Sequence, residues 1–306
     1  MGIVVLGAVF VDIKGYPQDV YIPAGRIEQV PGGVSRNVVE DIANVELRPT
    51  FVSLVDDTGL GEDVVRQLRN HKVNTDYMLR TSDGMGTWLA VFNNDGDVCA
   101  AISKRPDLRP LIALLDEKGD EIFRDADSIA LELDMDKEIV KRVFAYAQKY
   151  HKSVYAVVSN MTIAVERRDF LQQTDCFVCN RQEAGILFVE DFEDKTVEQM
   201  QQILLQKVKS ANIPRMIVTL GDVGAVYATA DGESGFCPAQ PVHVRDTTGA
   251  GDAFFAGITI GLTYGKGMQN ACAIGTRLAA ATICTLENVC PRFMPGEFGL
   301  EVPVTD

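Results

Sequence analysis

Histidine is scarce in this sequence, and several catalytic motifs are absent. The three histidines, His71, His151 and His243, lie in three separate segments, so they suggest neither a set of metal ligands nor a catalytic triad. No G-x-S-x-G sequence, which places the nucleophilic serine of many hydrolases, occurs in the chain. Chemistry based on a histidine-bound metal or on such a serine is therefore not expected.

Two common nucleotide-binding motifs are also missing. No G-x-G-x-x-G follows the first apolar run, which argues against dinucleotide binding. The nearest approach to a Walker A motif is residues 261–267, where the spacing is wrong and Lys266 is not followed by serine or threonine. A phosphate site in this chain has to be of another kind.

Basic residues are outnumbered by acidic ones, 29 to 43, which gives a formal net charge of -14. This excess argues against nucleic acid or an anionic membrane as the main partner. A small anionic ligand is still compatible, because a local cluster of backbone N–H groups can act against the overall field. No stretch reads as a membrane span, and 46% hydrophobic residues suffice for a sizeable core.

The seven cysteines are odd in number and scattered through apolar segments, which predicts reduced thiols and a cytoplasmic location. Residues 2–6 are too short for the core of a signal peptide and read as a buried strand. One C-x-x-C occurs, at Cys176 and Cys179. On a strand these thiols point to opposite faces, and no second pair completes a zinc site, so both are expected in the core.

Strand and helix patterns alternate along most of the chain. Strands are predicted at residues 2–6, 50–55, 75–80, 127–132, 153–158, 175–179 and 216–220, with helices between them, including one at 163–173. A hairpin at 225–237 and two apolar helices at about 250–264 and 267–284 follow. The alternation predicts an α/β fold with a doubly wound, mostly parallel sheet. Since no linker or repeat interrupts it, we expect one domain over residues 1–306.

Two segments do not fit this alternation. Residues 16–30 suggest short strands, and residues 86–103 contain Asn93-Asn94-Asp95-Gly96 between two strand patterns, which is a strong hairpin signal. We expect these segments, about 12–30 and 86–103, to pair as a small β-sheet lid over a ligand. Trp88, the only tryptophan, either lines the site or fills the core of the lid, as large aromatic side chains mostly do.

The most informative stretch is residues 246–252, D-T-T-G-A-G-D, which runs directly into an apolar helical pattern. Small residues before a helix leave backbone N–H groups bare, and the helix dipole adds positive potential, so Gly249, Ala250 and Gly251 predict an anion site. Asp252 stands beside that site in the first turn. A carboxylate there can take the proton from a hydroxyl that attacks phosphorus.

Four residues near the beginning of the chain are further candidates. Asp12 follows the first strand, near the sheet edge where open α/β proteins bind ligands, although an aspartate is also typical of a turn. Gly32 and Gly33 allow a ligand to approach the backbone, and Asn37 can point into the cleft from the next helix. A glycine turn that begins a helix without any ligand would look similar.

Two later strand ends add polar and small residues. Asn180 and Glu183 form an N-x-x-E, in which the carboxylate can hold Mg²⁺ directly or through water and the amide can hold phosphate. The same spacing is that of a helix capping box. Thr219, Gly221 and Gly224 form a glycine turn that suits the phosphates or ribose of a nucleotide.

The run from Asp246 to Asp252 resembles the ATP-site signature of the PfkB, or ribokinase-like, sugar kinases. Asp12, Gly32-Gly33 with Asn37, the N-x-x-E and the 219–224 turn stand in that family's order and spacing, so the resemblance covers nearly the whole chain. It implies the ribokinase-like fold and ATP-dependent transfer of a phosphoryl group to a hydroxyl of a sugar or nucleoside.

The resemblance also implies a role for each candidate position. Asp252 would be the general base, ionised near neutral pH, and the N–H groups of residues 249–251 would form the anion hole. The implied groups are Asp12, Gly32, Gly33, Arg36 and Asn37 for the acceptor, Asn180, Thr219, Gly221 and Gly224 for ATP, and Glu183 for Mg²⁺ through water. Asp246 and Thr248 resemble positions that bind potassium in some members.

Local motifs at residues 11–15, 32–37 and 232–235 are most similar to bacterial pseudouridine kinases. Arg36 stands where ribokinases carry a small residue, and it would either read a base or face solvent. Residues 43–47 lack the glycine-ended helix that is usual in both groups. The enzyme alternative is a kinase for fructose or for a sugar phosphate, whose distal phosphate would need cations such as Arg36, Lys104 and Arg105.

The non-enzyme alternative is a binding or regulatory protein with the kinase fold. Such a protein would be expected to have lost the general base, and Asp252 is present. The exposed face of the predicted lid would also allow two copies to pair as a homodimer, as in relatives.

Overall fold

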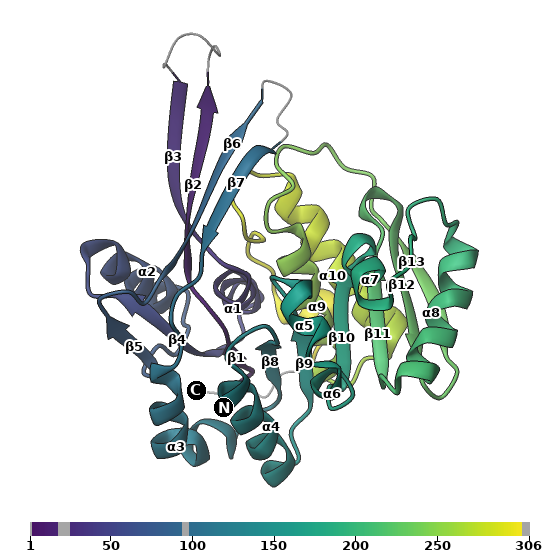
Figure 1. Ribbon diagram of the computed structural model, residues 1–306, viewed down its shortest axis with the longest axis horizontal. Helices are drawn as coiled ribbons and strands as arrows, with labels where there is room; N and C mark the ends of the chain where they lie inside the picture. The colour runs from purple at the N-terminus through teal and green to yellow at the C-terminus, as the bar shows by residue number, and fades with distance from the viewer. Residues whose placement is uncertain (1, 18–24, 94–97, 302–306) are drawn as a thin grey trace.

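The computed structural model describes residues 2–17, 25–93 and 98–301. Within them, a large nine-stranded sheet has helices on both faces, and a small four-stranded sheet projects beyond it (Figure 1). The strand order of the large sheet is β13-β12-β11-β10-β9-β8-β1-β4-β5. Its strands are β1 (Val4–Leu6), β4 (Thr50–Asp56), β5 (Met78–Thr81), β8 (Ile129–Glu132), β9 (Val154–Val157), β10 (Cys176–Asn180), β11 (Arg215–Thr219), β12 (Gly224–Thr229) and β13 (Ser234–Pro238).

The large sheet is parallel from β5 to β11, and β12 and β13 continue it in antiparallel pairing. Strand β1 pairs with β4 on one side and with β8 on the other, so the chain builds the sheet outward from β1 in both directions. This is the doubly wound, mostly parallel fold that the sequence predicts. Ligands of such sheets bind at the carboxyl ends of the strands, where the strand order reverses.

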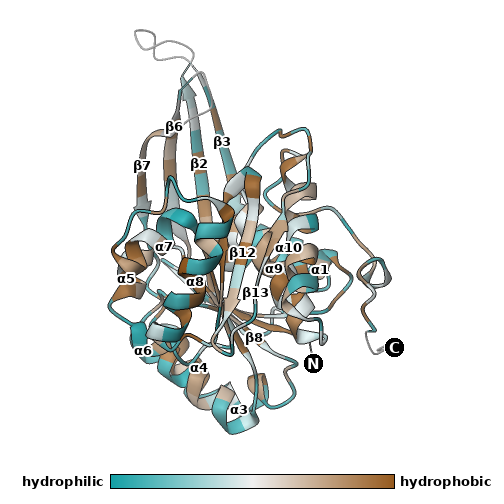
Figure 2. Cartoon of the chain, turned by 90° about the vertical axis from the view of Figure 1, so that its right-hand side faces the viewer, coloured by the Kyte–Doolittle hydropathy of each residue, from teal (hydrophilic) through white to brown (hydrophobic). Residues whose placement is uncertain are grey.

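Helices cover both faces of the large sheet because its strands are apolar on both sides. One face carries α1 (Val34–Asn44), α2 (Gly59–Asn70), α9 (Ala250–Thr263) and α10 (Met268–Ile283), and the other carries α3 (Pro110–Phe123), α4 (Lys137–Tyr150), α5 (Met161–Val165), α6 (Arg168–Leu171), α7 (Arg181–Phe188) and α8 (Val197–Ala211). In Figure 2, α4, α6, α7 and α8 present largely hydrophilic residues to solvent.

Two hydrophobic clusters fill the space between the sheet and these two layers. Val4 and Leu6 belong to one cluster, whereas Ile3 and Val5 belong to the other, as the two-residue period of a strand requires. Cys176 and Cys179 are likewise buried in opposite clusters, so their predicted core packing is confirmed. No described helix is long and apolar enough to cross a membrane.

The small sheet has the strand order β3-β2-β6-β7. Its strands are β2 (Phe10–Pro17), β3 (Gly25–Gly32), β6 (Gly86–Phe92) and β7 (Val98–Lys104), and β2 pairs with β6 in parallel. The two segments that break the βα alternation therefore come together as predicted. The predicted turn residues Asn94, Asp95 and Gly96 lie outside the described residues. Trp88 is half-buried opposite Asp12 and packs against the hydrophobic core.

Residues 163–173 are predicted to be helical, and this holds only in part. Two short helices, α5 and α6, occupy this segment, and Arg167 between them has non-helical dihedrals of φ -128 and ψ 41. Its guanidinium group donates to the main-chain carbonyls of Leu133 and Met135, at the end of β8. This long-range contact, which no local pattern reports, accompanies the break in the helix.

Candidate active site

The predicted anion site lies at the beginning of α9. Gly249 precedes the helix with a φ of 82, in the left-handed region, and no side chain caps the helix end. A Cβ atom on Gly249 would lie 2.0 Å from the main-chain oxygen of Asn288, so both conformation and space require glycine here. Gly251, by contrast, has open space around its Cα atom. The turn therefore exposes backbone to a ligand on the side of Gly251.

A cleft of about 450 Å³ opens beside this turn. The structure brings together here the predicted ATP-binding residues Thr219, Gly221 and Gly224 with Ala250 and Gly251. Apolar side chains make up much of the remaining wall, and they are Pro241, Val242, Val244, Phe254, Ala279, Ala280 and Ile283. The cleft thus combines a backbone surface suited to phosphates with an apolar wall suited to a planar base.

Asn180 and Glu183 form the capping box of α7. The Asn180 side chain accepts from the Glu183 N–H, and Glu183 Oε2 accepts from the Asn180 N–H, both at 2.8 Å. Burial raises the pKa of Glu183 above its ordinary value. Asn180 pairs with Thr219 on the neighbouring strand, which places the box beside the cleft. Because nowhere in the described chain do three or more acidic, cysteine or histidine side chains gather for a metal, any Mg²⁺ would depend largely on water and phosphate oxygens.

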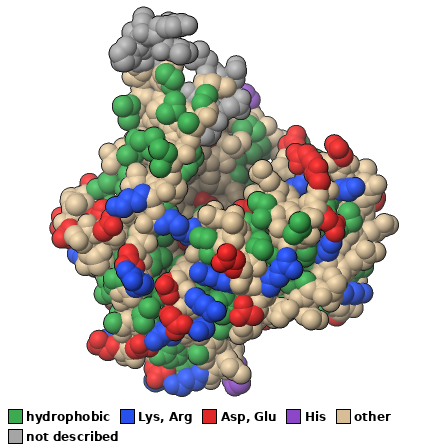
Figure 3. Space-filling view, in the orientation of Figure 1, with side chains coloured by type: hydrophobic (Ala, Val, Ile, Leu, Met, Phe, Trp, Pro, Cys, Tyr) green, Lys and Arg blue, Asp and Glu red, His purple; other side chains and the backbone are tan. Residues whose placement is uncertain are grey.

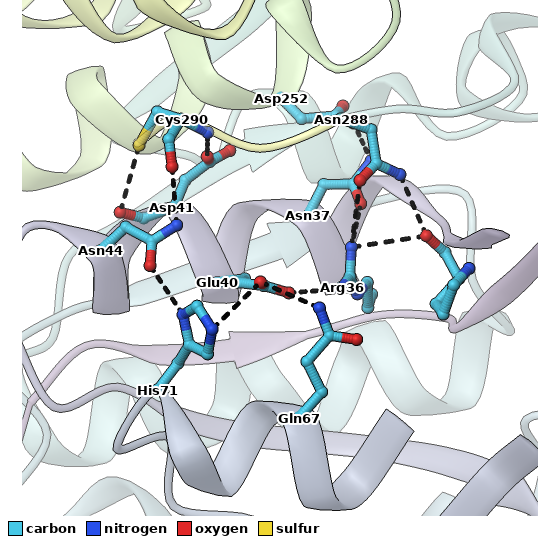
Figure 4. Close-up of polar contacts among 11 residues, drawn as sticks. Arg36, Asn37, Glu40, Asp41, Asn44, Gln67, His71, Asp252, Asn288 and Cys290 are labelled. Atoms are coloured by element: carbon cyan, nitrogen blue, oxygen red, sulfur yellow. Dashed lines mark hydrogen bonds and ion pairs between the residues drawn. The ribbon is translucent and has the colours of Figure 1, made fainter. Parts of the chain in front are cut away.

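Asp252 is tied to Asn37 across the interface between α9 and α1. Asn37 Nδ2 donates to Asp252 Oδ2 at 2.7 Å. Arg36 Nη1 donates to Asn37 Oδ1 at 3.1 Å, so the oxygen of the amide faces Arg36 and its nitrogen faces Asp252 (Figure 4). The sequence therefore identifies two residues, Asn37 and Asp252, that the fold brings into direct contact.

Arg36 is 2% exposed, so it does not face solvent, which was one of its two predicted orientations. Its guanidinium group pairs with Glu40 one helical turn away and also donates to Asn288 Oδ1 and the Pro31 carbonyl, at 3.3 and 3.4 Å. A buried guanidinium requires such partners. Arg36 thus holds Asn37 and the two turns that flank the site, and it is a positioning residue in this geometry.

Asp12 lies within β2 of the small sheet, where it is buried, rather than at the end of β1. A Cβ atom on Gly32 would meet Asp12 Oδ2 at 2.2 Å, so this glycine makes room for the carboxylate. Gly33 begins α1 with a φ of 100. Figure 3 shows a hollow at the foot of the small sheet, with acidic atoms visible inside it. Asp12 therefore reaches the site from the small sheet and not from the large one.

Glu132 is a site residue that the sequence reasoning missed. It ends β8 and is 1% exposed, and its Oε2 accepts from Ser35 Oγ at 2.9 Å and from the Ala8 N–H at 3.2 Å. Arg105 lies 3.7 Å from its other oxygen. The available signal was a carboxylate directly after an apolar strand, at the same sheet edge as the other candidates.

Three neighbouring carboxylates have raised pKa values. Burial, reinforced by the charges of Glu132 and Asp12, raises the pKa of Asp252 to about 7 against the hydrogen bond from Asn37. Burial raises the pKa of Asp12 to about 6 and that of Glu132 to about 7. Asp252 therefore holds a proton more firmly than an ordinary aspartate does. Its affinity for a proton is consequently that of a base matched to neutral pH.

The two residues assigned to potassium by resemblance are engaged by a lysine. Lys14 Nζ lies 3.2 Å from Thr248 Oγ1 and 3.5 Å from Asp246 Oδ2. Burial acts to raise the pKa of Asp246, but hydrogen bonds from Thr248 and the charge of Lys14 lower it below its ordinary value. Because an ammonium group already contacts both oxygens, these residues do not fit an additional potassium ion.

Residues 2–288 match the sequence pattern of the pfkB family carbohydrate kinases. The chain belongs to this family. A guanosine-inosine kinase of Exiguobacterium acetylicum is 32% identical over 295 residues, which cover 94% of this chain and 95% of that protein. The pseudouridine kinase of Escherichia coli strain K12 is 24% identical over 261 residues, which cover 84% of this chain and 82% of that protein.

Solved structures of pfkB relatives have the same fold. Arabidopsis thaliana ribokinase, in a complex with ribose and ATP, has a TM-score of 0.80 at 20% identity, with 97% of each chain covered. Adenosine kinase from Sinorhizobium meliloti has a TM-score of 0.76 at 20% identity, with 95% of each chain covered. The predicted ribokinase-like fold is confirmed, and the chain is a phosphotransferase that acts on a hydroxyl group of a sugar or nucleoside.

Proposed function

We propose that this pfkB kinase transfers the γ-phosphoryl group of ATP to the 5′-hydroxyl of a nucleoside. The observation that carries the proposal is the 2.7 Å hydrogen bond between Asn37 and Asp252, which joins a carboxylate in the first turn of α9, beside the cleft, to α1 near the buried Asp12 and Glu132. The acceptor hydroxyl would lie between the cleft and these carboxylates.

Groups of this chain would move the proton and stabilise part of the charge that develops in this reaction. Asp252 accepts the proton of the acceptor hydroxyl as its oxygen attacks the γ-phosphorus, and ADP leaves on the opposite side. Backbone N–H groups of the 249–251 turn would stabilise the charge that develops on the transferred group, chiefly those of Gly249 and Gly251, because the Ala250 N–H donates to the Thr247 carbonyl at 3.3 Å. Asn180 and Glu183 would hold Mg²⁺ through water, and this ion would neutralise phosphate charge.

The acceptor would be bound under the small sheet by Asp12 and Asn37, with the backbone at Gly32 and Gly33. Buried carboxylate and amide groups suit the hydroxyls of a ribose. The 32% identity to a guanosine-inosine kinase supports a purine nucleoside, and the local motifs support pseudouridine. A ribonucleoside is the acceptor class that both lines of support share. Closure of the small sheet as a lid would keep water from the γ-phosphate.

The sugar-phosphate alternative receives little support from the charges near the site. Each candidate cation already pairs with a carboxylate: Arg36 with Glu40, Lys104 with Asp83 at 2.6 Å, and Arg105 with Asp134 at 2.7 Å. A distal phosphate would have to displace one of these partners. This is why a nucleoside is preferred over a phosphorylated sugar.

An ADP-release screen tests the acceptor class. Guanosine, inosine and pseudouridine are compared with ribose, fructose and fructose 6-phosphate at equal concentration with ATP and Mg²⁺. We expect at least one nucleoside to exceed the free sugars in kcat/KM by about tenfold or more, because the base adds binding energy. A higher kcat/KM for fructose or fructose 6-phosphate than for every nucleoside would refute the nucleoside assignment.

The predicted homodimer stays a proposal, supported by three apolar side chains on the small sheet. Ile27, Leu89 and Ile102 are 78%, 40% and 73% exposed, and Leu89 pairs directly with Ile102. Strand alternation places them on the face opposite Asp12 and Lys14. Light scattering after gel filtration is expected to give twice the chain mass, and Ile102→Glu to halve it. A monomeric parent protein would exclude this pairing.

A further inference from the structure

We propose that the ε-ammonium group of Lys14 takes the place of a monovalent cation beside the anion-binding turn, so that phosphoryl transfer by this chain requires no potassium. The inference rests on the proposed kinase function for its catalytic consequence. Its structural part is that the Lys14 ammonium group already binds the Asp246 and Thr248 side chains. This part rests on contacts within the chain.

Lys14 is placed at this position by the small sheet. It lies two residues after Asp12 on β2, so strand alternation turns both side chains toward the site. Its side chain is only 7% exposed, although it carries a positive charge. A buried ammonium group needs a compensating charge and hydrogen-bond acceptors. Asp246 supplies the charge, and Thr248 Oγ1 supplies a second acceptor at 3.2 Å.

Asp246 connects this lysine to the backbone of the turn. Its Oδ1 accepts from the Thr248 N–H at 2.8 Å, while its Oδ2 lies 3.5 Å from Lys14 Nζ. Thr248 directly precedes Gly249, whose left-handed conformation begins the anion-binding turn. The carboxylate therefore couples a fixed positive charge to the geometry of the N–H groups that face the phosphates.

A second cation would be repelled from the same place. Lys14 follows Asp12 by two residues on β2 and its Nζ contacts Asp246 and Thr248 on the turn, so its charge lies between the acceptor side and the turn. An added potassium ion on the Asp246 and Thr248 side chains would lie within contact distance of the ammonium group and would have to displace it. Lys14 also joins the small sheet to the turn. The position of its ammonium group at the turn therefore depends on the position of the small sheet.

Cation replacement in a Lys14→Met variant tests the inference. The parent protein, Lys14→Met and a control, Lys195→Met at an exposed loop position, are assayed in tetramethylammonium, sodium, potassium and ammonium chloride at equal ionic strength. For the parent and Lys195→Met, kcat is expected to agree within about twofold in all four salts. For Lys14→Met, kcat is expected to fall about 100-fold in tetramethylammonium and to recover at least about tenfold in potassium or ammonium.

Three results would overturn the proposal. One is a parent enzyme that potassium activates by about tenfold or more over tetramethylammonium. The second is a Lys14→Met variant that keeps the parental kcat in tetramethylammonium. The third is a loss of kcat in Lys14→Met that neither potassium nor ammonium restores, which would assign Lys14 a role other than that of a replaceable cation.

Thermal unfolding in the same salts gives a readout that does not depend on activity. Potassium and ammonium are expected to raise the melting temperature of Lys14→Met relative to tetramethylammonium, because they bind the folded state, and to leave the parent unchanged. Equal melting temperatures of Lys14→Met in all four salts would contradict the proposal. A parent that is stable but phosphorylates no nucleoside would refute the proposed function alone, since the unfolding experiment would still test the cation position.

Discussion

Asn37 and Asp252 are 215 residues apart in the sequence, and a hydrogen bond of 2.7 Å joins Asn37 Nδ2 to Asp252 Oδ2. The bond crosses from α1 to α9, and these two helices pack on each other on one face of the large sheet. Asp252 lies in the first turn of α9, and the bond directs its carboxylate toward α1. The orientation of this one side chain decides whether the turn is only an anion site or also a site for proton transfer.

The pKa of Asp252 makes the reaction dependent on pH near neutrality. Because burial raises this pKa to about 7, protonation below pH 7 removes the base. We expect kcat/KM for the acceptor to fall by about tenfold for each pH unit below 7 and to level off above it. Initial rates between pH 5.5 and 8.5 measure this profile, and a flat profile over that range would contradict it.

A variant of Glu132 tests whether the pH dependence of kcat/KM comes from Asp252 or from another titrating group. The negative charge of Glu132 helps to raise the pKa of Asp252. Glu132→Gln removes that charge and is expected to move the midpoint of the pH profile to lower pH. An unmoved midpoint would assign the titration to a different group.

Arg36 is expected to act through Asn37 and Glu40 rather than on the substrate. Arg36→Met removes the guanidinium group that pairs with the buried Glu40 carboxylate and leaves only Gln67 and His71 beside it, which should cost about 3–5 kcal/mol of unfolding free energy. Adding Glu40→Gln removes that charge and should restore much of the stability. Arg36→Met should also lower kcat, because Asn37 Oδ1 loses its donor, and this loss should persist in the double variant.

Urea denaturation and steady-state kinetics on the single and double variants check both parts. Recovery of kcat together with stability would reduce Arg36 to a purely structural role. An unchanged stability of Arg36→Met would refute the account of the buried ion pair.

Gly249 and Gly251 provide a matched pair in the anion-binding turn. A Cβ atom at Gly249 meets the Asn288 carbonyl in a left-handed backbone, whereas a Cβ atom at Gly251 meets nothing within 4 Å. Gly249→Ala should therefore destabilise the fold by about 1–3 kcal/mol and weaken ATP binding, because the turn must move. Gly251→Ala should leave stability within about 0.5 kcal/mol of the parent. Equal stability of the two variants, measured by urea denaturation, would contradict this reading.

The sequence predicts the large sheet well because its parallel strands are covered on both faces. Strands such as β1 and β4 consequently read as short apolar runs, and the helices between them carry regular apolar patterns. The exception is the segment 163–173, where the Arg167 side chain contacts residues more than 30 positions earlier. A local pattern contains no information about such a contact.

The candidate site was predictable in its motifs and not in its contacts. The small residues in 246–252 and the helical pattern after them predict an anion site. The observed cleft adjoins that turn. The hydrogen-bond partners of Lys14 and Glu132 are separated from them by 97 to 234 residues, so only the fold reveals them. Arg36 and Glu40 are one helical turn apart, a spacing typical of exposed ion pairs, so the sequence does not reveal that this pair is buried.

The central claim is that Asp252 is the base in phosphoryl transfer to a hydroxyl, and Asp252→Asn tests it most directly. Transfer of labelled γ-phosphate from ATP to the best acceptor in the nucleoside screen is measured for this variant and the parent, with ATP affinity measured by calorimetry. We predict a fall in kcat of about 100-fold to 10,000-fold with ATP affinity nearly unchanged. A kcat within tenfold of the parent would contradict the account.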